Sequence, residues 1–152
     1  RHPRRDLARA GAAGAGAAAM SGAENALVRA LVAHLKADPT LAALVGERVW
    51  EDLRPGAAFP QLLLGPGESR PVAADGDLVE HRLTLSCASR FQGLEEVRAV
   101  AAAVRARLEG ARLEGDGMRT VSLGVTFVDA FRARDGARAW AVIRVRAVTE
   151  GE

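Results

Sequence analysis

Few residues in this sequence have the types and spacing that catalysis or metal binding requires. The three histidines, His2, His34 and His81, and the one cysteine, Cys87, are far apart, so none has a second His or Cys at metal-ligand spacing. His34 falls on an apolar helical stripe, and His81 and Cys87 fall on the apolar side of an alternating strand, which favours structural roles. We therefore expect no catalytic residue, no metal site and no bound cofactor.

Two loops resemble ligand-binding motifs only superficially. The loop "GPGESR", Gly65–Arg70, lacks the Gly-Lys-Ser/Thr ending with which a phosphate loop contacts phosphates and Mg²⁺. The turn "EGDG", Glu114–Gly117, holds two carboxylates but lacks the ligand pattern of a calcium loop. We therefore reject a phosphate loop at Gly65–Arg70, and we predict that Glu114–Gly117 is a solvated turn.

The residues most suited to contacts are charged and lie in loops or on one strand face. The loop Pro66–Gly76 is too long and too charged for a plain hairpin, and such loops are often functional. Arg144 and Arg146 share the polar face of the last predicted strand. Such a row is usually a solvated sheet face, but it can also pair with acids of a neighbouring subunit. The predicted interface residues are Glu68, Arg70, Asp75, Asp77, Arg132, Arg134, Asp135, Arg144 and Arg146.

Two amphipathic helices and several strands must position these charges. Apolar residues recur at helical spacing in Ala23–Ala37 and in Leu94–Leu108. Strand patterns occupy Arg48–Asp52, Pro60–Gly65, Leu78–Ser89, Arg119–Phe131 and Ala137–Glu150. The prediction is an α+β fold in which a mostly antiparallel sheet of about four to five strands packs against two amphipathic helices. In the fourth strand, alternation predicts that the inward residues are Val121, Leu123, Val125 and Phe127.

Composition predicts one folded domain, preceded by an N-terminal leader of a different composition. The chain has 152 residues, of which 49% are hydrophobic and 26% charged, the balance of an ordinary soluble domain. Residues 1–19 are rich in Ala, Gly and Arg, and we expect them to be a disordered leader that is not native, with one domain over residues 20–152. Those later residues carry 17 basic and 18 acidic side chains, a net charge of −1. A near-neutral body does not indicate a polyanion-binding face.

The ordered segments resemble a known family. The residues that carry the resemblance are "ADPTLAALVGERVW" (Ala37–Trp50), "PGAAFPQLLLG" (Pro55–Gly65) and "WAVIRVRAVTE" (Trp140–Glu150). They are similar to the small tail-completion, or tail-terminator, proteins of long-tailed phages and of the gene transfer agents derived from them. The similarity extends over about Ala23 to Glu150 and consists of packing and turn patterns.

The resemblance implies a structural protein of a virion or phage-like particle, and no enzyme. It implies a ring, usually a hexamer, that ends the tail tube and joins it to the head, after assembly in the bacterial cytoplasm. The implied partners are other copies of the chain, the major tail tube protein and the neck or stopper protein of the head. DNA would pass through the lumen without specific binding, and no membrane is involved.

Two other functions remain open from the residues alone. One is a small cytoplasmic enzyme or ligand-binding domain with a pocket near His81. The other is a nucleic-acid-binding adaptor that uses Arg82, Arg144 and Arg146. A titration of His81 that shifts with a small molecule would favour the first, and steep salt dependence of DNA binding would favour the second.

Overall fold

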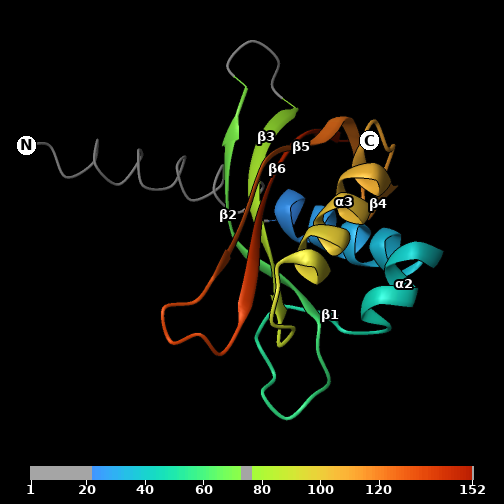
Figure 1. Cartoon of the computed structure of the whole chain (residues 1–152). Helices are drawn as coiled ribbons and strands as arrows, with labels where there is room; N and C mark the ends of the chain where they lie inside the picture. The colour runs from blue at the N-terminus through green and yellow to red at the C-terminus, as the bar shows by residue number, and fades with distance from the viewer. Residues whose placement is uncertain (1–21, 73–76, 152) are drawn as a thin grey trace, which may run out of the picture.

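Helices cover one face of a curled, six-stranded mixed sheet, as the computed structural model shows (Figure 1). The structure describes residues 22–72 and 77–151. The predicted leader, residues 1–19, lies outside the described residues. The α+β class is as predicted, but the sheet has more strands than the predicted four to five.

Three helices occur in the described residues, and sequence signals explain their ends. Residues 22–36 are helical, and α2 (Pro39–Val45) follows after a break. Asp38 caps α2 because its Oδ2 accepts a hydrogen bond from Leu41 N at 3.0 Å. Pro39 fits the first helical position because a backbone N–H there would have no partner within the helix. The third helix, α3 (Glu95–Leu108), has acids in its first turn and arginines in its last, which suits the helix dipole.

The sheet is mixed because its first strand pairs in parallel with its second. The strands are β1 (Val49–Trp50), β2 (Gln61–Pro71), β3 (Leu78–Ser89), β4 (Glu114–Gly115), β5 (Met118–Arg132) and β6 (Ala139–Gly151). Their order is β1-β2-β3-β6-β5-β4, and β1 is parallel to β2 whereas every other pair is antiparallel. The long central strands matched the predicted ranges, and the additional strand, β4, has only two residues.

The segment predicted to be a loop from Pro66 is largely strand, so that part of the prediction was wrong. Strand β2 runs to Pro71 and crosses "GPG" through an irregularity between Leu64 and Gly67. A bulge at a sheet edge tolerates a proline, which cannot donate to the ladder. A larger residue in place of Gly67 would make the Leu83 side chain shift, because a Cβ at this position would overlap Leu83 Cδ2.

Two bulges in β5 overturn part of the predicted inward face. Register shifts fall between Thr120 and Ser122 and between Val125 and Phe127. Each shift adds one residue and so exchanges the faces of the strand beyond it. Val121 is consequently 56% exposed and Phe127 46% exposed, although Leu123 is buried as predicted.

The core lies between the helices and the inner face of the sheet. The predicted helical stripes are buried: Leu27, Leu31 and Leu35 from the first helix are fully inaccessible, as are Val97 and Val104 from α3. They pack against alternating residues of the central strands. Those strand residues include Leu83, Leu85, Cys87, Ala141, Ile143 and Val145.

The segment between β1 and β2 is held by one buried amide. Gln61 is fully buried, and its Oε1 accepts hydrogen bonds from Trp50 Nε1 at 3.1 Å and from Arg54 N at 3.0 Å. Its Nε2 donates to Arg54 O at 2.7 Å and to Ala58 O at 3.3 Å. This clamp fixes β1 and the loop after it against the end of the sheet.

Candidate interaction surface

Charged side chains gather on the face of the sheet that α3 does not cover. In register, Glu68 of β2 lies beside Arg82 of β3, which lies beside Arg146 of β6. The next row places Arg70 beside Glu80. Glu68, Arg70 and Arg146, predicted separately as contact residues, are therefore neighbours on one surface.

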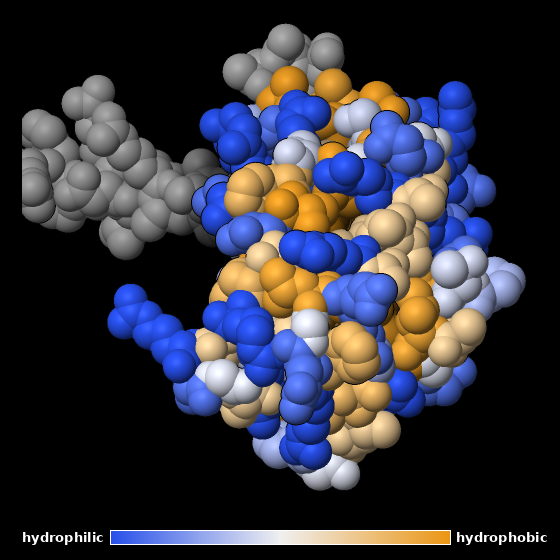
Figure 2. Space-filling model, in the orientation of Figure 1, coloured by the Kyte–Doolittle hydropathy of each residue, from blue (hydrophilic) through white to orange (hydrophobic). Residues whose placement is uncertain are grey.

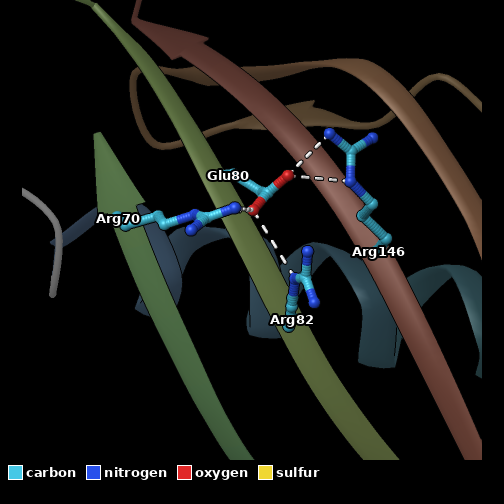
Figure 3. Close-up of polar contacts among 4 residues, drawn as sticks. All are labelled: Arg70, Glu80, Arg82 and Arg146. Atoms are coloured by element: carbon cyan, nitrogen blue, oxygen red, sulfur yellow. Dashed lines mark hydrogen bonds and ion pairs between the residues drawn. The ribbon is translucent and has the colours of Figure 1, made fainter. Parts of the chain in front are cut away.

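Glu80 is the centre of this surface (Figure 3). Arg146 Nε donates to Glu80 Oε2 at 2.8 Å, Arg70 Nε donates to Oε1 at 2.8 Å, and Arg82 Nε lies 3.5 Å from Oε1. The Glu80 side chain is only 8% exposed because the arginines cover it. The hydrogen bond from Arg146, followed by that from Arg70, lowers the pKa of Glu80 below its usual value, and desolvation opposes them.

A groove of about 580 Å³ lies next to this cluster on the same face. Its arginines are Arg82, Arg144 and Arg146, and its apolar wall includes Phe127. The Arg144 guanidinium lies 5.3 Å from the centre of the Phe127 ring, in cation–π range. Glu68 also lines the groove, and Arg82 and Arg146 already pair with Glu80, so Arg144 is the groove arginine that has no ion-pair partner among the described residues.

The other predicted contact residues lie elsewhere. Arg132 and the turn residues Arg134 and Asp135 belong to the β5–β6 hairpin, at the end of the sheet opposite the β2–β3 hairpin. Arg132 donates to Phe91 O and Gln92 O, which joins the hairpin to the segment before α3. Asp135 accepts from Ala137 N within the turn. The structure thus separates the predicted residues into a sheet face and a hairpin tip.

The β2–β3 connection carries the last two predicted residues. Asp77 is exposed and precedes β3 directly. Asp75 lies outside the described residues. Their role in contacts therefore stays a prediction.

His81 belongs to a buried chain of polar groups. Its Nδ1 lies 2.7 Å from Ser69 Oγ, and its Nε2 lies 2.8 Å from Thr149 Oγ1. Ser69 Oγ in turn donates to Glu24 Oε1 at 2.6 Å, so the chain ties the first helix to three strands. His81 is fully buried, and burial lowers the pKa of its imidazole.

This arrangement does not resemble a nucleophile and its base. The Ser69 hydroxyl donates its one hydrogen bond to Glu24, so it can accept a hydrogen bond from His81 but cannot donate one to it. Both ring nitrogens are occupied, and neither reaches solvent. The geometry therefore gives His81 a structural role and argues against a catalytic pocket built on it.

Comparison with known proteins places the chain in a family. The family model for tail completion protein gp17 matches residues 29–150, well over half of the sequence. The chain belongs to the tail completion protein gp17 family. The resemblance expected from the sequence is thereby confirmed.

Solved structures give relatives of the same fold. A chain from the "Virion of native gene transfer agent (GTA) particle" is 31% identical, with a TM-score of 0.77, and the match covers 85% of this chain and 98% of that one. A second solved chain is 17% identical with a TM-score of 0.52, covering 87% and 94%, and shows the fold alone. No curated protein sequence matches this chain.

Cys87 and His34, the other described residues that could take part in catalysis or metal binding, are buried or hydrogen-bonded. Burial raises the pKa of the Cys87 thiol to about 12, so it is not a reactive thiolate. His34 Nε2 lies 3.1 Å from Arg107 O and joins the first helix to α3. Across residues 22–72 and 77–151, no three His, Cys, Asp or Glu side chains gather where they could hold a metal ion. No helix in that part of the chain could cross a membrane.

Sequence reasoning did not single out two central residues. One is Glu80, which is nearly buried because Arg70, Arg82 and Arg146 surround it. The sequence signal that could have identified Glu80 is a single acid among arginines on adjacent strands. Gln61 was not singled out either, because a clamp between a strand and its preceding loop has no periodic pattern.

Proposed function

We propose that this protein is a structural component of a phage-like particle and forms a ring that ends the tail tube and joins it to the head. The observation that carries the proposal is its 31% identity, over nearly all of the other chain, to a component of a gene transfer agent virion. Membership of the tail completion protein gp17 family supports the same conclusion. The role is structural and not enzymatic.

The shape of the subunit supports a role in which each end of the sheet contacts a different neighbouring protein. The β2–β3 hairpin projects at one end of the sheet and the β5–β6 hairpin at the other (Figure 1). A ring built from such subunits has one face for the tail tube protein and one for the neck protein of the head. The proposed docking residues in or beside these hairpins are Asp77, Arg132, Arg134 and Asp135. Asp75, which stands between β2 and β3 in the sequence, is proposed with them.

The remaining proposed contact residues lie on the sheet face between those ends. Glu68, Arg70, Arg144 and Arg146 line or border the arginine groove. In the proposed ring, usually a hexamer in this class, DNA passes through the lumen without sequence-specific contact, and assembly takes place in the bacterial cytoplasm.

Imaging particles from a producing strain that lacks the protein tests the proposal. Electron microscopy should show separate heads and tail tubes of irregular length, because nothing ends the tube or joins it to the head. Supplying the wild-type chain from a plasmid should restore joined particles. Joined particles with tails of normal length in its absence would disprove the proposed role.

The groove supports one second candidate, a nucleic-acid-binding adaptor. It brings together Arg82, Arg144 and Arg146, the three residues that sequence reasoning named for this role. Backbone phosphate contacts would make DNA binding fall steeply with salt, and changing the three arginines to glutamine would reduce that salt slope. A protein that does not bind DNA at low salt would exclude this candidate.

A further inference from the structure

The β5 edge of the sheet has a long stretch without a strand partner. Gly110 N donates to Leu123 O at 3.2 Å, and Thr120 N donates to Leu113 O at 2.8 Å, so the start of β5 is covered. From Gly124 to Arg132, no other described residue pairs with this edge. Backbone groups of alternate residues therefore point away from β6 and are available to another strand.

An apolar groove lies beside this open edge. It has a volume of about 590 Å³ and lies between Val128 of β5 and one side of α3. The α3 residues that line it are Arg98, Ala101, Ala102, Arg105, Ala106 and Glu109. Arg98 and Arg105 are exposed and form no ion pair with any described residue. Figure 2, in the orientation of Figure 1, shows that apolar residues (orange) are interspersed with hydrophilic ones (blue) on this side of the molecule.

Two acids follow the outermost strand at the opposite edge of the sheet, where exposed Arg54 also stacks on the Trp50 ring. There β1 (Val49–Trp50) is the outermost strand, and Glu51 and Asp52 follow it directly. Both acids are exposed, and within residues 22–72 and 77–151 neither has an ion-pair partner. One edge thus offers two unpaired arginines beside an apolar groove, and the other offers two unpaired acids.

The two edges also lie at the same level along the strands. The register runs from Trp50 to Leu63, from Leu63 to Ser86, from Ser86 to Val142 and from Val142 to Asp129, and this row joins β1 to the open part of β5. The pairing directions make β1 antiparallel to β5. A second copy in the same orientation can therefore continue the sheet as an antiparallel neighbour.

We infer that the α3–β5 edge of one copy binds the β1 edge of a second copy, with Glu51 and Asp52 of that copy facing Arg98 and Arg105. The contact joins two different surfaces of the same chain. Repeated head to tail, it closes into a ring when the rotation per subunit divides the circle. This inference rests on the proposed ring and assigns the surfaces that build it.

Charge exchange tests the contact by sedimentation of the full-length protein in about 0.05 M salt, where such pairs are least screened. The first variant is R98E/R105E and the second is E51R/D52R. Each variant alone should associate at least roughly tenfold more weakly than the wild type, because like charges then face each other. An equimolar mixture should associate again, since each altered edge finds its complement on the other variant.

A matched control reverses the same number of charges elsewhere. R29E/R112E changes two exposed arginines that line neither the α3–β5 groove nor β1. It also breaks the ion pair between Arg29 and Asp116, and it should still associate like the wild type. Circular dichroism of all variants confirms that each is folded. Unchanged association of R98E/R105E, no recovery in the mixture, or a wild type that stays monomeric at millimolar concentration would overturn the inference.

The failure of this contact can be told apart from the failure of the proposed function. If the charge-exchange variants still form rings and joined particles, the ring uses other surfaces and only this inference is wrong. If the variants behave as expected in solution but particles form normally without the protein, the contact stands and the proposed role in the tail is wrong.

Discussion

Replacing Gln61 with leucine tests how the β1 edge is held in place. The buried amide makes four hydrogen bonds, to the indole of Trp50, to both backbone groups of Arg54 and to Ala58 O. Leucine keeps a similar volume but makes none of them. Each bond contributes about 0.5–1.5 kcal/mol to the free energy of unfolding. Arg54 and Ala58 are exposed, so water replaces part of the loss.

We therefore expect Gln61→Leu to lower the free energy of unfolding by about 2 kcal/mol, the low end of four such bonds. Urea denaturation measures this loss. The two tryptophans report it, and Trp50 loses its hydrogen-bond partner directly. Hydrogen exchange should rise in residues 51–60 before it rises in the core, because the clamp holds that loop and not the core strands.

A smaller change provides the control. Trp50→Phe removes one of the four hydrogen bonds and should cost about 0.5–1 kcal/mol. If Gln61→Leu costs less than about 0.5 kcal/mol, the lower limit for a single bond, packing alone holds β1 and the reasoning about the clamp is refuted.

Three further predictions concern the sheet and its cover. The pKa of Glu80 in the folded protein is lowered from the usual value of 4.5, so its ionised form stabilises the fold above that pH, and the stabilisation is lost as the pH falls below it. Glu80→Gln should remove this part of the loss of stability in acid. Melting temperatures from about pH 7 to about pH 3 measure it, and an unchanged profile would contradict the role of the arginines around Glu80. Gly67→Ala should lower the free energy of unfolding by about 1–3 kcal/mol, because the new Cβ meets Leu83, while Gly56→Ala, with open space around it, should have little effect. Val104→Asp should prevent folding because it buries a charge on the core side of α3, and a soluble, cooperatively folded variant would show that this face is not core.

The sequence predicted the elements whose periodicity is regular. The stripe of Leu27, Leu31 and Leu35 and the alternation through Leu83 and Leu85 both appear in the core. These patterns are local, because each position that faces the core needs an apolar residue. The helices and the long strands were therefore predictable.

The bulges were not predictable from alternation. A bulge inserts one residue and changes no composition, so the pattern over Val121 and Phe127 continues on paper while the faces exchange in the structure. The same reasoning explains β2, where Pro66 and its two glycines indicated a loop but the strand continues through an irregularity.

The sequence indicated which charged residues could make contacts, but it did not indicate which of them lie together in the structure. Arg70 and Arg146 converge on Glu80 only because β2, β3 and β6 are neighbours, an arrangement that joins residues 66 positions apart. Strand order is a property of the whole chain, which local patterns do not encode. Arg132 was predicted as a contact residue, yet in the described residues it binds the chain before α3.

Locating the protein within intact particles tests its proposed position between the tail tube and the head. A gold-labelled antibody raised against the protein, viewed by electron microscopy, should bind at one place per particle, where the tail meets the head. Label along the length of the tube, at the far tip of the tail, or absent from purified particles would contradict the account.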